Sequence, residues 1–283
     1  MADRQVTNIG LALGGGGAKG LAHICMLEVI DEFGIEPSRI AGTSIGAIIG
    51  VLYASGMSAR TLREEIESVS QMEKDNFAGT VRNIFNWLQL LEVNWKGGSL
   101  LKADAFLDDV MRYVKVSDFE ELRMPLKVVA ADFWHRDEVV LGTGDIRTAV
   151  HASMALPGIF EPVVVDGRVL VDGGVINPVP YDLIMDECDI TIAIDVMGNR
   201  TETVGLVPSL PESIFNTFQI MQKSILRQKI AAHPPDIYIC PEIVDILMLE
   251  FHEAAEIFAQ AGAAADQLRR ELERHLKGAN CQL

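Results

Sequence analysis

Short apolar runs alternate with helical patterns along most of this chain, and this order is the strongest constraint on its fold. The runs at 125–132 and 190–196 are almost continuously apolar, as strands of a parallel sheet are when both faces of the sheet are covered. The expected strands are 8–13, 39–42, 125–132, 139–142, 190–196 and 237–239, and the expected helices are 21–33, 45–55, 59–70, 145–155, 213–229 and 250–277. The pattern predicts an α/β fold of three layers (α/β/α), in which a central, mostly parallel sheet lies between helices.

The clearest local signal is a β-hairpin. Two β-branched runs, at 163–165 and 168–171, are joined by Asp166-Gly167. Asp-Gly is favoured at two-residue hairpin turns, because both positions take positive φ angles.

The composition is that of one globular domain. The chain has 283 residues, of which 49% are hydrophobic and 23% charged, which is enough apolar material for a substantial core. Because no repeat, low-complexity linker or shift in composition divides it, we expect a single domain over 1–283. Within it, a motif-bearing core occupies 8–200 and a helical C-terminal part occupies 205–283.

Charge and the chain ends limit the partners and the compartment. A formal net charge of -16 argues against nucleic acid and against tight docking on anionic membranes, so we expect at most transient membrane contact, made by apolar side chains. The N-terminus lacks the basic segment of a secretory signal, and the four cysteines are scattered without metal-binding spacing. These features predict a cytoplasmic protein.

The pentapeptide Gly-Thr-Ser-Ile-Gly at 42–46 joins an expected strand to an expected helix. In such a turn the serine hydroxyl stands clear of the sheet, and the two glycines let the strand and the helix approach without a Cβ clash. The same letters also fit a glycine-rich turn with a capping serine, but the flanking strand and helix favour Ser44 as a nucleophile.

A glycine-rich run at 14–20 lies upstream, again between a strand and a helix. Its backbone N–H groups can converge on one point and stabilise a developing negative charge. A nucleophile and an anion-stabilising loop together suggest acyl transfer.

Asp172 is the candidate base. It closes the strand 168–171 and precedes Gly173-Gly174, so its carboxylate emerges at a strand end, where open α/β sheets place their sites. The prolines at 178 and 180 argue against a second hairpin strand after it. His151, in the helix 145–155, is kept as a weaker alternative base. Helical or turn contexts indicate structural or surface roles for His23, His135, His233 and His252.

Together, the glycine run, the serine pentapeptide and Asp172-Gly173-Gly174 resemble the three signatures of the patatin-like phospholipase family, in the same order. The sequence Ser-Met-Ala-Leu-Pro-Gly at 153–158 adds to the match. The resemblance covers about residues 8–200 and is loose beyond them, and Lys19 stands where many relatives carry arginine.

The resemblance implies hydrolysis of an acyl ester, often a phospholipid or lysophospholipid, without a metal or other cofactor. Ser44 would be the nucleophile, Asp172 the base of a Ser–Asp dyad, and the N–H groups of Gly15, Gly16 and Gly17 the oxyanion hole. Because a free aspartate has a pKa of about 3.9 and is a poor base for a hydroxyl, we expect Asp172 to be poorly solvated and within hydrogen-bond reach of Ser44.

Two other classes of function fit parts of the sequence. Gly15-x-Gly17-x-x-Gly20 after a strand matches a dinucleotide-binding fingerprint, but the acidic residue near the required spacing, Glu36, precedes Pro37 in a loop. A non-enzymatic regulator or adaptor could retain every motif residue.

The region 77–101 has apolar residues at roughly helical spacing that end at Lys96-Gly97-Gly98. We expect an amphipathic helix packed on the core, with a lid or membrane-contact helix as the alternative.

Overall fold

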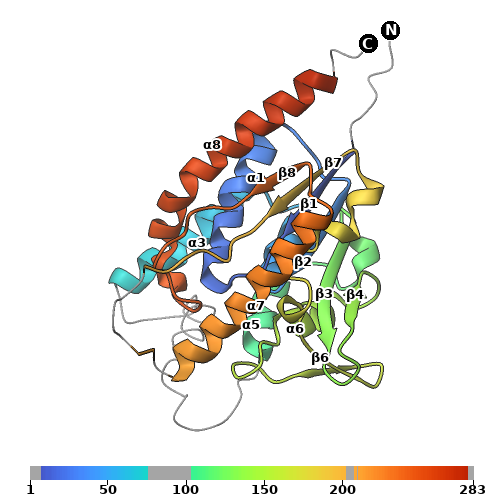
Figure 1. Cartoon of the computed structure of the whole chain (residues 1–283), viewed down its shortest axis with the longest axis vertical. Helices are drawn as coiled ribbons and strands as arrows, with labels where there is room; N and C mark the ends of the chain where they lie inside the picture. The colour runs from blue at the N-terminus through green and yellow to red at the C-terminus, as the bar shows by residue number, and fades with distance from the viewer. Residues whose placement is uncertain (1–7, 76–102, 202–206, 209, 280–283) are drawn as a thin grey trace.

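The computed structural model describes residues 8–75, 103–201, 207–208 and 210–279, so the region 77–101 lies outside the described residues. Within them, one eight-stranded sheet has the strand order β5-β6-β3-β2-β1-β7-β8, with β4 beside β3. The strands are β1 (Ile9–Leu13), β2 (Arg39–Thr43), β3 (Leu126–Asp132), β4 (Glu138–Leu141), β5 (Val163–Val165), β6 (Arg168–Asp172), β7 (Ile190–Ile194) and β8 (Ile237–Ile239). Strands β1, β2, β3, β7 and β8 pair in parallel, whereas β4 and β6 pair antiparallel with β3, and β5 pairs antiparallel with β6. This confirms the mostly parallel sheet (Figure 1).

The described helices cover both faces of this sheet and complete the expected α/β/α layers. They are α1 (Ala22–Glu32), α2 (Ile45–Ala54), α3 (Ala59–Asp75), α5 (Asp104–Val114), α6 (Ile146–Met154), α7 (Leu210–Ala232) and α8 (Ala254–Ala279). The helix α5 was not among the expected elements, although Leu107, Val110 and Val114 recur at helical spacing and are buried.

The two faces of the sheet carry side chains of different size. Leu11 and Leu13 of β1 point to the face covered by α1, α2 and α8, where large aliphatic side chains fill the space between layers. Between them, Ala12 points to the opposite face, where its register partners are Ala41 and Ala193. This row of small side chains lets the chain around 179–184 and the helix α7 pack closely against the sheet.

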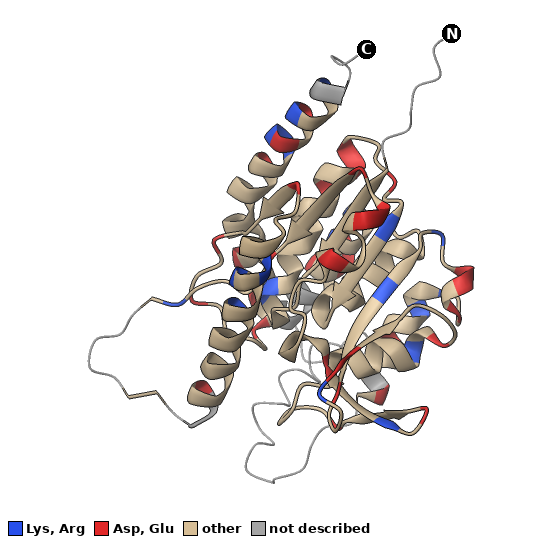
Figure 2. Cartoon of the chain, turned by 45° about the vertical axis from the view of Figure 1, so that its right-hand side comes forward, with Lys and Arg blue, Asp and Glu red and all other residues tan. Residues whose placement is uncertain are grey.

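Charged residues are found mostly on the helices and turns, while the strands carry few (Figure 2). Arg39 and Lys127, at the starts of β2 and β3, share Glu187 at 2.8 and 2.6 Å. No helix in the described part of the chain combines the length and the apolarity that a bilayer crossing requires.

The predicted hairpin is confirmed. Residues of β5 and β6 pair antiparallel from Val163–Leu170 to Val165–Arg168. Asp166 and Gly167 have φ angles of 48° and 79°, the two positive values that an Asp-Gly turn accommodates.

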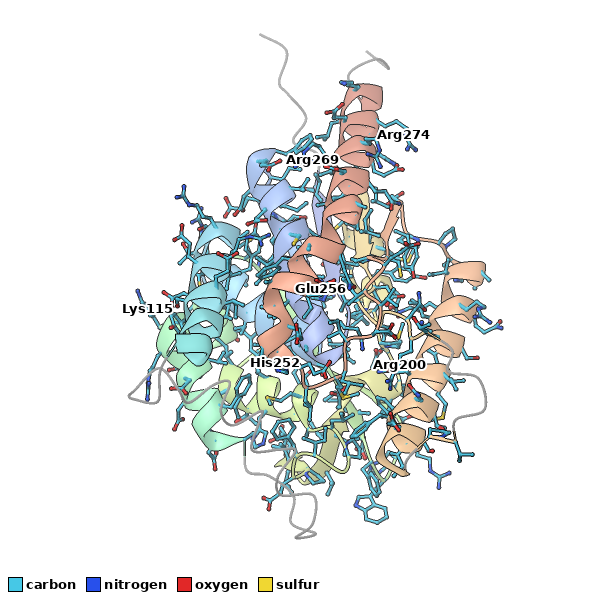
Figure 3. The ribbon with its side chains drawn as sticks, turned by 90° about the vertical axis from the view of Figure 1, so that its left-hand side faces the viewer. Lys115, Arg200, His252, Glu256, Arg269 and Arg274 are labelled. Carbon is cyan, nitrogen blue, oxygen red and sulfur yellow. The ribbon has the colours of Figure 1, made fainter. Side chains whose placement is uncertain are left out.

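The helix α8 packs along α1, and its own side chains Leu268 and Leu272 are fully buried in the core. Its outer side carries charged residues: Figure 3 shows Arg269 and Arg274 toward its C-terminal end and Glu256 toward its N-terminal end. Arg269 also bridges to Glu32 of α1 at 2.8 Å.

Removing this buried apolar contact tests whether α8 is energetically part of the core. We expect Leu268→Ala to lower the free energy of unfolding by about 2–5 kcal/mol, because the truncation loses transfer free energy and leaves a cavity. Arg270→Ala, on the exposed side of α8, is the matched control and is expected to stay within about 0.5 kcal/mol. Urea unfolding would measure both variants, and equal losses of stability in the two would contradict the packing of Leu268 in the core.

Candidate active site

Ser44 occupies a strained turn between β2 and α2. Its φ and ψ are 56° and -123°, a conformation that non-glycine residues rarely adopt. The surrounding backbone is very close: a Cβ on Gly46 would clash with the carbonyl oxygen of Leu13, and one on Gly42 would lie 2.6 Å from the carbonyl oxygen of Gly46. Both glycines are thus required by the close approach of α2 to the sheet, as the sequence predicted.

The sheet register brings Asp172 to Ser44 across β3. Thr43 pairs with Val129 on one side of β3, and Asp172 pairs with Ala130 on the other side. The residue that follows Thr43 is therefore level with Asp172. The Ser44 hydroxyl donates a hydrogen bond of 2.6 Å to Oδ2 of Asp172, so the predicted proximity is confirmed.

Asp172 is shielded from water. It is 2% exposed, and its other carboxylate oxygen, Oδ1, accepts the N–H of Gly174 at 2.7 Å. Burial raises the pKa of Asp172 to about 6, although the hydrogen bonds from Ser44 and Gly174 oppose the shift. The expected poor solvation is confirmed, and the carboxyl group has a proton affinity suited to proton exchange near neutral pH.

Ser153 fixes the backbone of the turn at Ser44, a role that the sequence did not predict. The fully buried Ser153 hydroxyl accepts the N–H of Ser44 at 2.9 Å and donates to the carbonyl oxygen of Val129 at 2.6 Å. It links the turn to β3, between Ser44 and Asp172.

Gln222 holds the backbone of the turn after Asp172, and the sequence did not predict this role either. It extends from α7, is 6% exposed, and donates from Nε2 to the carbonyl oxygen of Gly174 at 3.1 Å. Gly174 is the residue whose N–H binds Asp172, so α7 helps to hold the carboxylate. A polar residue in a long helix gave no signal in the sequence of where its side chain would point.

The glycine loop between β1 and the 3₁₀ turn Gly17–Leu21 lies beside Ser44, and its N–H groups are not equivalent. Those of Gly14 and Gly15 donate to the carbonyl oxygens of Ile194 and Pro178 at 3.0 and 2.9 Å. Gly16 and Gly17 have no acceptor for their N–H groups among the described residues, and both line the pocket at Ser44. The loop therefore has two unbonded N–H groups at this pocket, while Gly14 anchors it to β7 and Gly15 to the segment after β6.

The histidines are placed away from Ser44. His23 is buried under the glycine loop, with Nε2 at 2.8 Å from the carbonyl oxygen of Gly14, and burial lowers its pKa to about 4. His151 lies on α6, does not line the pocket at Ser44, and has its pKa lowered by burial. The structure thus joins Ser44 to Asp172 and brings His151 to neither.

The pocket at Ser44 has a volume of about 70 Å³ and a largely apolar lining. Its polar groups are confined to the glycine loop, Ser44, Asp172, Gln219 and Gln222. Its apolar lining consists of Ile45, Ile48, Phe106, Met154, Leu156, Ile159, Phe160, Phe218, Met248, Leu249 and Phe251. A site of this kind suits an apolar group that carries one reactive polar centre.

The features required by a dinucleotide site are not assembled around the glycine loop. Glu36 is exposed and pairs with Arg123 at 3.3 Å, and two of the loop N–H groups are already bonded to backbone. Among the described residues, no cluster of three or more His, Cys, Asp or Glu side chains is arranged to hold a metal ion.

Comparison with known proteins finds the family model "Patatin-like phospholipase" over residues 11–185. An uncharacterized NTE family protein of Mycobacterium tuberculosis is 33% identical over 193 residues, covering 68% of this chain and 50% of the relative. Lysophospholipase NTE1 of Kluyveromyces lactis is 25% identical over 279 residues, covering 90% of this chain and 19% of the relative. This chain therefore spans half or less of the length of these relatives.

Among solved structures, VipD of Legionella pneumophila matches with a TM-score of 0.50 at 13% identity, covering 93% of this chain and 66% of that protein. At this identity the likeness concerns the fold alone.

The buried carboxyl of Asp172 predicts a specific dependence of stability on pH. Its folded pKa of about 6 lies above the unfolded value of about 3.9, so the wild type loses stability as the pH rises from about 4 to 6 and does not regain it above 6. We expect Asp172→Asn to raise the free energy of unfolding by about 1–3 kcal/mol at pH 8, with little change near pH 4. Urea unfolding at both pH values measures the difference.

Asp132→Asn is the matched control, because its expected change in the free energy of unfolding has the opposite sign. The N–H and ring of His135 and the N–H of Trp134 hold the pKa of this carboxyl below its usual value, so its charge stabilises the folded state. We expect Asp132→Asn to lower stability at pH 8. If both variants lost stability at pH 8, the carboxyl of Asp172 would not be desolvated.

Proposed function

The chain belongs to the patatin-like phospholipase family, and we propose that it hydrolyses acyl esters of lipids, of the phospholipid or lysophospholipid class, with Ser44 as nucleophile and Asp172 as base. The observation that carries the proposal is the 2.6 Å hydrogen bond from the Ser44 hydroxyl to a buried carboxylate. The name of the Kluyveromyces lactis relative, lysophospholipase NTE1, supports this substrate class.

In the first half of the proposed reaction, Oγ of Ser44 attacks the ester carbonyl carbon while its proton passes to Oδ2 of Asp172. The carbonyl oxygen becomes an oxyanion and accepts hydrogen bonds from the N–H groups of Gly16 and Gly17, for which the described part of the chain holds no competing acceptor. The tetrahedral intermediate then collapses. Its alcohol leaves with the proton from Asp172, and the acyl group stays on Ser44 as an ester.

In the second half, Asp172 takes a proton from a water molecule, which attacks the acyl-enzyme carbonyl carbon. The same two N–H groups hold the second oxyanion. When this intermediate collapses, Oγ leaves and recovers a proton from Asp172, and the carboxylic acid is released. One side chain thus serves as base and acid in both halves, which requires a pKa near the working pH.

Variants of the three candidate residues test the assignment. With p-nitrophenyl butyrate, we expect Ser44→Ala to abolish turnover and Asp172→Asn to lower kcat by about 10²–10⁴-fold, the size of a general-base contribution. His151→Ala is the control, and its activity should stay close to that of the wild type. Loss of activity in His151→Ala with retention in Asp172→Asn would replace the dyad by a triad.

The pH dependence of kcat/KM is a second test. Because only the carboxylate form of Asp172 can accept the proton, we expect kcat/KM to rise with pH through about 6 and to level off above it. Initial rates between pH 4.5 and 8.5 would show this limb. A flat profile over this range would argue against Asp172 as the base.

A regulator or adaptor that retains the fold is the alternative outcome. It would be indicated if the folded wild type turned over no ester across a range of chain lengths.

A further inference from the structure

A second apolar cavity, of about 80 Å³, lies behind the pocket at Ser44, between α2, α3 and α5. Four side chains, Ile45, Ile48, Phe106 and Phe251, line both spaces. The cavity is further lined by Leu21, Ile49, Leu52, Met57, Leu62, Glu65, Ile66, Val110 and Tyr113. It therefore adjoins the reactive centre through a wall of apolar side chains.

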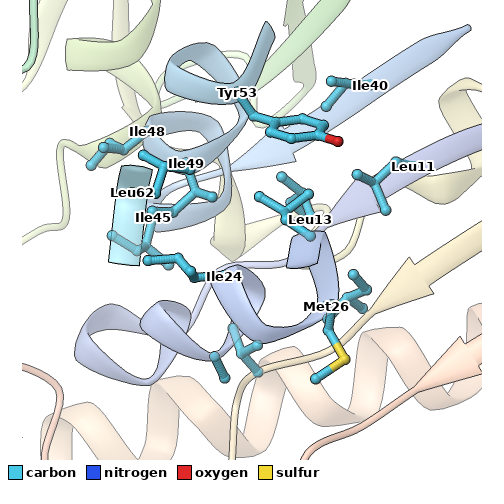
Figure 4. Packing of buried hydrophobic residues seen from close by; sticks show 14 of the residues in the cluster. Leu11, Leu13, Ile24, Met26, Ile40, Ile45, Ile48, Ile49, Tyr53 and Leu62 are labelled. Carbon is cyan, nitrogen blue, oxygen red and sulfur yellow. The ribbon is translucent and has the colours of Figure 1, made fainter. Parts of the chain in front are cut away.

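The helix α2 connects the two spaces. Ile45 and Ile48 follow Ser44 within one helical turn, and Ile49 continues the same apolar surface; Figure 4 shows these three side chains gathered around Leu62 of α3. An alkyl group that reaches the cavity from Ser44 passes Ile45 and Ile48, and the charged side chain in the described lining is Glu65. Apolar side chains dominate this lining, so an alkyl group that covers them is removed from water together with them, which is favourable.

The far side of the cavity carries its polar lining. The hydroxyl of Tyr113, on α5, donates to Oε2 of Glu65, on α3, at 3.0 Å. An alkyl chain reaching this pair would have to break the hydrogen bond and desolvate a carboxylate, which is unfavourable. The pair therefore marks where an apolar ligand must end.

The other apolar space near Ser44 is different in kind. It is a groove of about 420 Å³ between α7 and Leu156-Pro157, and two of its lining residues, Ile214 and Met221, are 48% and 52% exposed. An alkyl chain in this groove would remain partly in contact with water. The gain from removing a methylene group from water is therefore larger in the cavity between α2, α3 and α5.

We propose that this cavity is the acyl-chain site: it takes the alkyl chain of the acyl group transferred to Ser44, and the Glu65–Tyr113 pair limits its length. The inference rests on the proposed function, because it names where that substrate binds. An apolar cavity of about 150 Å³ holds one benzene molecule, so this space of about 80 Å³ takes a few terminal carbons.

Val110 allows a test that leaves the pocket at Ser44 unchanged, because it lines the cavity but not that pocket. The readout is the ratio of kcat/KM for p-nitrophenyl octanoate to that for the acetate, measured within each variant. A methylene group kept in water costs about fourfold. We expect the ratio to fall about tenfold or more in Val110→Phe and about fourfold in Val110→Leu, the second variant being the gentler one for folding.

Two further variants separate a change in chain-length preference from a general loss of stability. Val110→Ala enlarges the cavity and should move the preferred chain length upward, whereas destabilisation alone would shift both kinds of variant in the same direction. Thr217→Phe, in the exposed groove beside α7, should change the ratio by less than about twofold. Equal ratios in all the Val110 variants, with turnover still dependent on Ser44, would overturn the acyl-chain site and leave the proposed function intact.

If the wild type cleaves no ester, the proposed function fails and binding decides the inference. Isothermal titration calorimetry with 1-octanol, a neutral probe, should then show binding to the wild type that weakens about fourfold in Val110→Leu. No binding of 1-octanol, or equal binding to both proteins, would overturn the acyl-chain site.

Discussion

The close contact between α2 and the strand β1 is the constraint on which the site depends. Gly46 lies against the carbonyl oxygen of Leu13 with no room for a side chain, and a Cβ on Gly42 would lie 2.6 Å from the carbonyl oxygen of Gly46. Because α2 begins there, Ser44 is forced into a positive φ angle, and its hydroxyl is directed away from the sheet. The same contact sets the first turn of α2 beside the glycine loop that follows β1.

Around this fixed turn, the neighbouring groups are held by backbone contacts as much as by side chains. Ser153 binds the N–H of Ser44, and Gln222 binds the carbonyl oxygen of Gly174, which in turn binds Asp172. Such preorganised hydrogen bonds cost no reorganisation during a reaction. Gln222 comes from α7, beyond the residues 11–185 matched by the family model, so the C-terminal part contributes to the site as well as covering the sheet.

Burial raises the proton affinity of the Asp172 carboxylate and also makes its charge unfavourable for folding. An aspartate removed from water is a stronger base, and the fold carries an unfavourable charge to keep it so. Sites built for function often reduce stability in this way. Four apolar side chains of the pocket that Asp172 lines, Ile45, Ile48, Phe106 and Phe251, also line the cavity between α2, α3 and α5. The surroundings of this carboxylate and of the cavity are therefore built from the same side chains.

Sequence patterns were sufficient to predict the α/β layers, most strands and helices, the hairpin and the turn at Ser44, because these depend on local periodicity and on glycines where no side chain fits. They also singled out Asp172, from a strand end followed by Gly173-Gly174. The folded chain was needed to show that β3 sets Asp172 level with Ser44 and that Ser153 and Gln222 hold the two turns. It also showed that Gly15 is bonded, whereas Gly16 and Gly17 have no acceptor among the described residues. These contacts join residues that are far apart in the chain. They depend on strand register and helix packing, which the sequence around each residue does not reveal.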